Sequence, residues 1–351
     1  MKIGILTFHW STNYGAILQA YSLQEYLRRQ GHDVEIVNYK PQKYDFSWFV
    51  FIRHPRMLKR LRRELANRKK EQMLTSFRNQ YLRMTRRYSS VSEFDDALKQ
   101  YDVLISGSDQ VLNPNITMQG ENGKPCLAYW LALGSEAQKR IGYAVSFGFE
   151  SYPDNAVGVV KGAVNGFDAI GVREESGKSI LNQLGYKGGS MLTPDPTILL
   201  GKDLFKCLKI AVPVVKDEYT CIYMLRHEIS VEGNVRYIDE QHQPLGMEEW
   251  LNAITSAKNM ITNSYHGMIM ALFAHVPFVV LLEKGRASGM NDRFYTLLSE
   301  LGFLNRLANS VEEAQTILSE PIDFEKVDQQ IDRFRRIGAI FINQNVNMKE
   351  S

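Results

Sequence analysis

Short apolar runs alternate with longer segments of helical apolar spacing from the beginning of the chain. Residues 2–8, KIGILTF, and residues 33–39, DVEIVNY, are the first two short runs. Residues 15–31 lie between them, carry apolar side chains at helical spacing and end on a glycine, which commonly stops a helix. This order of strand, helix and strand predicts a βαβ unit, whose strands are parallel and belong to a doubly wound sheet.

The alternation resumes after residue 90 in two series. The first series predicts strands at DVLISGSD, KRIGYAVSFG and FDAIGVREESG, and it closes with a turn-rich segment over residues 188–200. The second series begins at residue 218 and predicts strands at EYTCIYML, NVRYIDE, MITNSYHG and PFVVLLE. Helices are predicted within this series at MEEWLNAITSAKN and from Gly267 onward.

Two such series, separated by a connector near residues 200–218, predict two Rossmann-like domains that face each other across a cleft. We expect the first domain to cover residues 1–200 and the second to cover residues 201–323. Residues 324–351 are expected to form a C-terminal helix, and packing against the first domain is one arrangement open to it.

The composition is that of an ordinary globular protein, with 44% apolar and 23% charged residues. The first apolar stretch is only about five residues long, too short for a signal peptide, and no run approaches the roughly 18 apolar residues that cross a bilayer. Cys126, Cys207 and Cys221 are an odd number without metal-ligand spacing, so we expect neither a disulfide framework nor a zinc site. We therefore expect a cytoplasmic protein.

Residues 41–90 interrupt the alternation with a basic insert. Between residues 53 and 87, ten arginines and three lysines stand against two glutamates, a net charge of +11 in a chain whose total is +3. FSWFVFI precedes this charge, and apolar residues lie at helical spacing beneath it: Met57, Leu58, Leu61 and Leu65. One interpretation is a peripheral contact with an anionic membrane, and the other is a solvated helix pair that caps the first domain. No nucleic-acid-binding motif accompanies the charge, so we expect no nucleic-acid partner.

Asn13, Tyr14 and Gly15 lie where the first predicted strand gives way to a helix. The N-terminus of a helix exposes N–H groups and a partial positive charge, which favour a bound phosphate or carboxylate. Asn13 and Tyr14 add hydrogen-bonding groups to this turn. A structural explanation is equally open, because Asn13 is also a good helix cap and Gly15 relieves steric crowding.

SGSDQVLNP, residues 106–114, follows a buried strand, at the edge where ligands gather in open α/β sheets. Ser108 and Asp109 come after a glycine, which lets a substrate or another backbone approach closely. Asp109 is a candidate to exchange a proton with a sugar hydroxyl. A role as a helix or turn cap is the alternative.

Arg173 directly follows another predicted strand, in VREESG. Its planar guanidinium suits a carboxylate or a phosphate, although an ion pair with Glu174, Glu175 or another carboxylate is equally open. Asp195 lies between two prolines in TPDPT, which indicates a fixed turn. We expect Asp195 to be structural, with contact to the site left open.

The polar run Asn263, Ser264, Tyr265 and His266 ends a strand, and Gly267 begins an apolar helix. A histidine titrates near neutrality, so it can donate a proton or, when protonated, bind an anion. The neighbouring helix N-terminus assists anion binding but disfavours the protonated ring. Because polar groups converge in ligand pockets, we favour a functional role for His266, with Asn263 and Ser264 beside it.

The chain resembles the polysaccharide pyruvyl transferase family from residue 1 to about residue 310. The order and spacing of six motifs carry the resemblance: GILTFHWSTNYGAILQAYSLQEYL, DVLISGSDQVLNP, YAVSFG, VREESG, DPT and ITNSYHGMIMALFAHVPFV. It implies a GT-B-like α/β fold, in which two Rossmann-like domains enclose the site. It also implies transfer of a pyruvyl group from phosphoenolpyruvate to a sugar, usually as a cyclic ketal, with no metal or other cofactor.

The resemblance implies roles for individual residues. Arg173 would hold an anionic group of phosphoenolpyruvate, and His266 would bind its phosphate or act as the acid. Asp109 would act on the acceptor hydroxyl, with Ser108 beside it. The turn from Asn13 to Gly15 would line the cleft.

One position departs from the family pattern. Characterised members often carry Arg-x-His where this chain has Ser264, Tyr265 and His266, so a phosphate-binding cation is missing from its expected place. Arg293 is expected to supply that cation from the following loop, with Lys284 and Arg286 as the other candidates.

Three functions remain open at this point. The favoured one is a pyruvyl transferase that acts on a sugar of a surface polysaccharide or on its lipid-linked or nucleotide-linked precursor. If the basic insert contacts lipid, the protein would lie at the inner face of the membrane. The second is a GT-B-type sugar-nucleotide glycosyltransferase. The third is a non-catalytic scaffold that docks on a membrane through residues 41–90.

Overall fold

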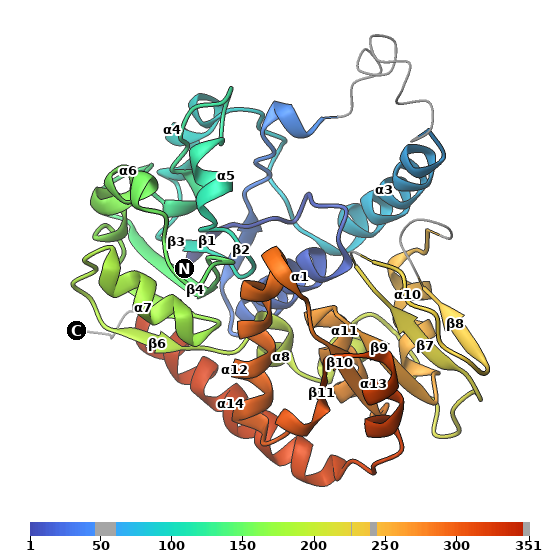
Figure 1. The fold of residues 1–351 in the computed structure, drawn as a ribbon. Helices are drawn as coiled ribbons and strands as arrows, with labels where there is room; N and C mark the ends of the chain where they lie inside the picture. Colours follow the sequence, from blue (N-terminus) through green and yellow to red (C-terminus); the bar gives the residue numbers. More distant parts are fainter. Residues whose placement is uncertain (46–60, 226, 239–243, 347–351) are drawn as a thin grey trace.

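The structure is a computed structural model that describes residues 1–45, 61–225, 227–238 and 244–346. The FSWFVFI run and the predicted apolar positions Met57 and Leu58 lie outside the described residues. Two parallel sheets, each with helices around it, form two α/β units that lie apart from one another, with α1, α8 and α11 between them (Figure 1).

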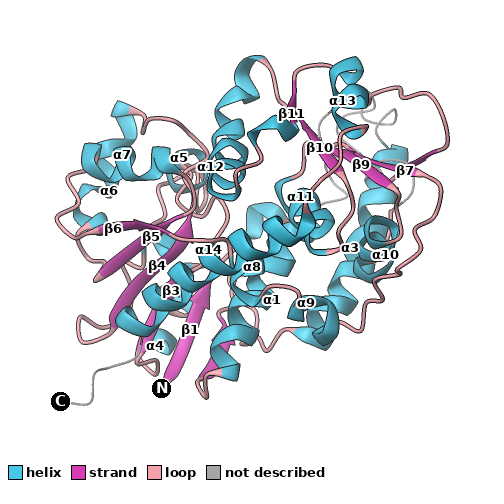
Figure 2. Cartoon of the chain, turned by 90° about the horizontal axis from the view of Figure 1, so that it is seen from below, coloured by secondary structure: helices cyan, strands magenta, loops and turns pink. Residues whose placement is uncertain are grey.

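The first sheet has six described strands in the order β2-β1-β3-β4-β5-β6, all parallel. Their bounds are β1 Lys2–Leu6, β2 Asp33–Ile36, β3 Val103–Ser106, β4 Lys139–Val145, β5 Ala169–Val172 and β6 Ser190–Leu192. β3 and β5 are buried along their whole length, which explains why all their residues except Ser106 are apolar or glycine. Figure 2 shows α6 and α7 on one face of this sheet and α1 and α14 on the other.

The second sheet has five described strands in the order β11-β10-β9-β7-β8, again all parallel. Their bounds are β7 Thr220–Tyr223, β8 Val235–Tyr237, β9 Asn259–Thr262, β10 Phe278–Leu281 and β11 Leu307–Ala308. Because all the described strands of a sheet are parallel, their carboxyl ends lie at the same edge of that sheet.

The described α-helices lie between most pairs of successive strands, although β8 follows β7 without one. Those before β6 are α1 Tyr14–Arg29, α3 Leu61–Tyr81, α4 Asp95–Leu98, α5 Pro114–Met118, α6 Asp154–Val164 and α7 Glu175–Gln183. Those after it are α8 Pro196–Leu200, α9 Asp203–Cys207, α10 Met247–Thr255, α11 Tyr265–Phe273, α12 Asp292–Leu301, α13 Val311–Leu318 and α14 Phe324–Asn345. None of the described helices is both long enough and apolar enough to cross a bilayer.

Residues 188–200 contain a strand and a helix, β6 and α8, and the expectation of turns alone was wrong. The strand has three residues and the helix has five, which is too short for a hydrophobic periodicity to be recognised. The neighbouring glycines and prolines are typical of turns. The error matters for function, since α8 lies at the centre of the molecule.

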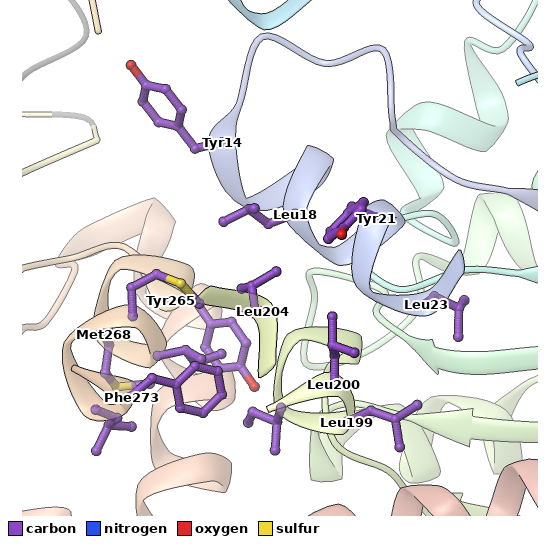
Figure 3. Packing of buried hydrophobic residues seen from close by; sticks show 14 of the residues in the cluster. Tyr14, Leu18, Tyr21, Leu23, Leu199, Leu200, Leu204, Tyr265, Met268 and Phe273 are labelled. Atoms are coloured by element: carbon purple, nitrogen blue, oxygen red, sulfur yellow. The ribbon is translucent and has the colours of Figure 1, made fainter. Parts of the chain in front are cut away.

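One hydrophobic core joins the two sheets through α1, α8 and α11. Leu18 of α1, Leu200 of α8, and Tyr265 and Met268 of α11 belong to a single buried cluster that extends to both sheets (Figure 3). Burial of apolar surface is the dominant stabilising term in folding, so this shared cluster favours a fixed arrangement of the two sheets. The ends of α1 and α11 therefore meet at a well-packed boundary.

The C-terminal helix α14 packs against α8 and α12. Phe341 of this helix contacts Tyr143 of β4, with ring centres 5.9 Å apart. Gly338 lies so close to β4 that a Cβ there would be 2.6 Å from the Tyr143 hydroxyl. The helix thus covers the face of the first sheet although it follows the second sheet in sequence.

The described part of the basic insert packs on the protein. Lys70 of α3 is 1% exposed, and its ammonium lies 4.0 Å from the centre of the Tyr14 ring. Three of the arginines, Arg78, Arg83 and Arg87, pair with Glu71, Asp33 and Asp45 respectively. Part of the basic charge is therefore neutralised within the chain, and the membrane contact stays a prediction.

Candidate active site at the domain boundary

Asp195 occupies the centre of a buried polar cluster between the two sheets. It is fully buried and caps α8, where its Oδ1 accepts hydrogen bonds from the backbone N–H of Thr197 at 2.9 Å and from its hydroxyl at 2.8 Å. Pro196 follows it at the first position of the helix, where the fixed φ of proline and its missing N–H are tolerated. This sequence of proline, aspartate and proline fixes the carboxylate in place.

The second oxygen of Asp195 faces three groups from different parts of the chain. Oδ2 accepts a hydrogen bond from the Ser108 hydroxyl at 3.0 Å and one from Arg173 Nη1 at 3.3 Å. His266 Nε2 lies 3.4 Å from the same oxygen, an ion pair when the ring is protonated. Burial alone would raise the pKa of Asp195, but the charges of His266 and Arg173 and the Thr197 hydrogen bond lower it below the usual range of an aspartate.

Arg173 is held among carboxylates and an aromatic ring. Its guanidinium pairs with Asp195, with Glu174 Oε2 at 3.4 Å and with Asp109 Oδ1 at 3.7 Å, and it lies 5.0 Å from the centre of the Tyr265 ring. Burial would lower its pKa, but these carboxylates raise it above the ordinary value, so the group is cationic. Its Nη2 is nevertheless buried and has no hydrogen-bond partner among the described residues.

Glu174 adds a second buried carboxylate beside Arg173. It accepts a hydrogen bond from the Ser146 hydroxyl, and burial raises its pKa above the usual value although Arg173 and Ser146 oppose the shift. Asp109 is more accessible, with its side chain 21% exposed, and its φ of 73° is in the left-handed region that side chains other than Asn and Asp rarely adopt. Asp109 is therefore the member of the cluster nearest to solvent, held in a strained conformation of the kind that gathers at functional sites.

His266 lies in the first turn of α11 and closes the cluster from the second domain. Ser264 caps this helix by accepting a hydrogen bond from the Gly267 N–H at 3.2 Å. A Cβ on residue 15 would lie 2.0 Å from His266 Nδ1, so only a glycine allows α1 and the imidazole to come together. His266 Nε2, like Arg173 Nη2, is buried without a hydrogen bond to any described residue.

This arrangement is chemically unusual because buried donors are normally satisfied. A guanidinium and an imidazole each present a buried nitrogen at one domain boundary, next to the carboxylates of Asp109 and Asp195. Such a site suits an anionic ligand, whose oxygens accept from Arg173 and His266. No group of three or more potential metal ligands occurs among the residues that the structure describes.

The model of one protein family, polysaccharide pyruvyl transferase, matches residues 13–284. The chain belongs to this family. The match covers Ser108, Asp109, Arg173, Asp195 and His266, all of which the structure brings together, so the cluster is built from the part of the chain that defines the family.

Solved structures of other proteins share the fold. UDP-GlcNAc 2-epimerase from Methanocaldococcus jannaschii matches with a TM-score of 0.54 at 12% identity, over 97% of this chain and 99% of that one. A putative UDP-N-acetylglucosamine 2-epimerase from Listeria monocytogenes matches with a TM-score of 0.54 at 10% identity, over 99% and 97% of the two chains. No significant match was found among curated protein sequences. These likenesses confirm the predicted GT-B-like fold of two Rossmann-like domains, and at such identities they show the fold alone.

Other residues predicted for the site bond elsewhere or act as caps. Asn13 caps α1 through the N–H of Ala16 at 3.2 Å. The Tyr14 hydroxyl donates to the carbonyl of Leu245 at 2.7 Å, and its ring stacks on Trp250 at 4.8 Å, away from Asp195.

Asn263 lies at the carboxyl end of β9 and is also used within the second domain. Its Nδ2 donates to Glu283 Oε1 at 2.7 Å, and its Oδ1 accepts from the N–H of Leu225 at 2.7 Å. Arg293, by contrast, reaches the cluster, because its guanidinium lies 5.8 Å from the centre of the Tyr265 ring. Lys284 is exposed on the loop after β10, and the Arg286 side chain lies outside the described residues.

The site also contains residues that the sequence analysis did not include in it. Asp195 was expected to be structural, Glu174 appeared only as a potential ion-pair partner of Arg173, and Tyr265 was only part of a polar run. All three are buried in the cluster, and Tyr265 lies within 6 Å of both Arg173 and Arg293. The prolines on either side of Asp195 could have indicated its place in the site, because they fix the position of the carboxylate as well as the turn.

Proposed function

We propose that the protein transfers a pyruvyl group from phosphoenolpyruvate to hydroxyl groups of a sugar during the assembly of a surface polysaccharide. The family supports pyruvyl transfer. The observation that carries the proposal further is the position of two buried nitrogens, Arg173 Nη2 and His266 Nε2, which make no hydrogen bond to a described residue and lie 3.7 Å from Asp109 Oδ1 and 3.4 Å from Asp195 Oδ2 respectively. Phosphoenolpyruvate brings a carboxylate and a phosphate, which are the acceptors such donors bind best.

His266 is the acid in this proposal. Transfer requires a proton on the methylene carbon of phosphoenolpyruvate, which leaves an oxocarbenium-like centre at the adjacent carbon. The imidazole lies 3.4 Å from the Asp195 carboxylate, which orients the ring for this role. Asp195 thus acts through His266 and does not need to touch the substrate.

Arg173 and Arg293 supply positive charge for the two anionic groups of the donor. Ion pairs with Asp195 and Glu174 hold the Arg173 guanidinium in place, so its Nη2 is already oriented before the donor substrate binds. Arg293 approaches the same cluster beside Tyr265 and takes the place of the cation that this chain lacks before His266.

Asp109 is the base for the acceptor. Its carboxylate is the solvent-accessible member of the cluster, and it takes the proton of a sugar hydroxyl as the oxygen attacks the oxocarbenium-like carbon. A second hydroxyl then attacks the same carbon, phosphate leaves, and a cyclic ketal remains. The protons of the two hydroxyls go to Asp109, to the leaving phosphate or back to the imidazole, which has given its own proton to the methylene carbon.

Phosphate release from phosphoenolpyruvate in the presence of candidate glycosides tests the proposal. We expect release by the natural sequence and a loss of at least about a hundredfold in His266→Ala and Arg173→Ala. His275→Ala is the matched control, because His275 follows the C-cap of α11 and pairs with Asp328 on the surface instead of joining the cluster. Folding of each variant is verified by circular dichroism.

Full activity in both cluster variants would exclude this site. Protection against thermal unfolding separates the other two functions, because a ligand stabilises in proportion to its occupancy of the folded state. Protection by UDP- or GDP-sugars but not by phosphoenolpyruvate would favour a glycosyltransferase, and protection by neither would favour a scaffold.

A further inference from the structure

A polar groove lies beside Asp109 at the boundary of the two domains. It consists of two adjoining cavities of about 450 and about 610 Å³, which share Glu150 and Ser288. Its first-domain wall comes from the loops after β3 and β4 and from the start of α7. Its second-domain wall comes from residues 288–291 and the start of α12. The combined space accommodates more than one sugar ring, and pockets at domain interfaces are common ligand sites.

Amides and hydroxyls make up most of the groove wall. Gln110, Asn113, Asn115, Ser151 and Ser288 line the smaller cavity. Each amide offers donors and an acceptor, and each hydroxyl offers both, which matches the groups of a polyol. This lining differs from the cationic environment that an anionic ligand would require.

The charged groups of the wall are carboxylates. Glu150, Glu175 and Asp292 line the larger cavity, and no described Lys or Arg side chain lines either cavity. Lys178 offsets Glu175 by pairing with it at 2.8 Å, and Asp292 accepts a hydrogen bond from the Ser176 N–H at 3.1 Å. Glu150 is exposed on the loop after β4. The wall therefore repels an acidic ligand.

The amide wall is held in place before any ligand binds. Asn113 is 9% exposed, its Nδ2 donates to Gln110 Oε1 at 3.1 Å, and its Oδ1 accepts from the N–H of Asn115 at 2.9 Å. Gly148 packs against the same amides with φ of 69°, and a Cβ there would lie 2.6 Å from Gln110 Oε1. A fixed wall lowers the entropy lost when a flexible saccharide is bound.

We propose that this groove binds an uncharged saccharide as the acceptor, and that it discriminates against uronates and phosphorylated sugars. The role of the saccharide as acceptor rests on the proposed function, whereas the binding of a saccharide is argued from the groove itself. Gln110 follows Asp109 and Glu175 follows Glu174, so the groove begins where the reacting cluster meets solvent. In this inference, a hydroxyl of the bound sugar comes within reach of Asp109, the residue before Gln110.

Direct saccharide binding to the full chain, measured by ligand-observed NMR without phosphoenolpyruvate, tests the inference. The probes are the methyl glycosides of glucose and galactose and their uronate counterparts. We expect the neutral glycosides to bind and the uronates to bind at least about threefold more weakly. Glu150→Lys is expected to reverse this preference, and Glu150→Gln to reduce it.

The control is Glu136→Lys, which makes the same change of charge on an exposed loop before β4 and outside the groove. It is expected to leave the preference unchanged. Uronates that bind the natural sequence as tightly as neutral glycosides, an unchanged preference in Glu150→Lys, or no binding of any glycoside overturns the inference. Failure of phosphate release leaves these binding results intact, so loss of the proposed function and loss of the groove are distinguishable.

Discussion

The two strand–helix junctions that meet at the domain boundary each carry a buried histidine, but the two rings have different partners. His9 follows β1, and its nitrogens lie 3.0 Å from the carbonyl of Thr7 and 2.9 Å from Asn38 Oδ1. His266 follows β9 and faces the Asp195 carboxylate. Both rings are almost completely inaccessible to solvent, at 1% and 6% exposure.

The partner decides what each imidazole can do. Burial lowers the pKa of His9 to about 4, against the smaller opposing effect of its hydrogen bonds, and the nearby charges of Arg78 and Lys40 lower it further. His9 is therefore neutral near neutral pH and stabilises the loop after β1. His266 is similarly buried but faces a carboxylate in place of an amide, so burial alone does not distinguish a structural histidine from a reactive one.

The largest effect is expected from removing the Asp195 carboxylate, the partner that distinguishes His266 from His9. Asp195→Asn gives His266 an amide partner like that of His9, and we expect phosphate release from phosphoenolpyruvate to fall about a thousandfold. Arg173 loses a counter-ion in the same variant, so the free energy of unfolding is expected to fall by about 3 kcal/mol. Steady-state kinetics and urea unfolding measure the two effects.

The matched change on the other side is Asn38→Asp, which gives His9 a carboxylate. It is expected to leave phosphate release within a few fold of the natural sequence, because His9 contacts none of the groups assigned to the reaction. An Asp195→Asn variant that keeps its activity would show that the carboxylate is not what separates the two histidines.

The close contact between the junctions offers the next largest effect. Gly15→Ala places a Cβ 2.0 Å from the present position of His266 Nδ1, so the ring or α1 must move. We expect activity to fall about a hundredfold and the free energy of unfolding to fall by about 1–3 kcal/mol. Gly158→Ala in α6, where a Cβ would meet no atom within 4 Å, is the control and is expected to change neither activity nor the His266 environment.

The low pKa of His9 predicts a loss of stability in acid. Above about pH 6.5 the ring is neutral in both the folded and the unfolded chain. As the pH falls from 6.5 toward 4, the unfolded chain takes up a proton that the folded chain cannot, so the free energy of unfolding decreases. At pH 4.5 the expected loss from this residue is about 2 kcal/mol relative to pH 7.

Urea unfolding at pH 7 and pH 4.5 measures this loss, and His9→Gln is expected to remove it. A decrease of equal size in the variant would mean that another group is responsible. Asp195 does not overlap with this window, because its lowered pKa stabilises the fold above the ordinary aspartate range and that contribution is lost only below about pH 4.

The smallest effect is expected from a hydroxyl that supports the carboxylate. Ser108→Ala removes the 3.0 Å hydrogen bond to Asp195 Oδ2, which weakens the fixed position of that oxygen beside His266. We expect about a tenfold decrease in kcat and a loss of about 1–2 kcal/mol in the free energy of unfolding. Ser146→Ala removes the corresponding bond to Glu174 and is expected to affect stability with a smaller effect on kcat.

The fold was predictable because strands and helices alternate with clear periodicity. The runs that became β1, β3, β5 and β10 are apolar along their length, as buried parallel strands are. β6 and α8 escaped the analysis because tertiary contacts, and not local pattern, stabilise elements of three and five residues.

The candidate site was predictable in part for a topological reason. Ser108, Arg173 and His266 follow different strands, and the carboxyl ends of parallel strands converge. Asn263 follows a strand in the same way, yet it bonds to Glu283, because the direction of a side chain depends on neighbours that are distant in sequence. Asp195 was expected to be structural with contact to the site left open, because its partners Ser108 and His266 lie far from it along the chain.

The central claim is that His266, and not His9, meets an anionic donor substrate. Two-dimensional NMR of the imidazole nitrogens during a titration with phosphoenolpyruvate tests it most directly, with His266→Gln used to assign the signals. The account predicts that the His266 signals shift toward those of a charged ring that donates a hydrogen bond, while the His9 signals keep their positions. Unchanged His266 signals at saturating phosphoenolpyruvate, or equal shifts at both rings, would contradict it.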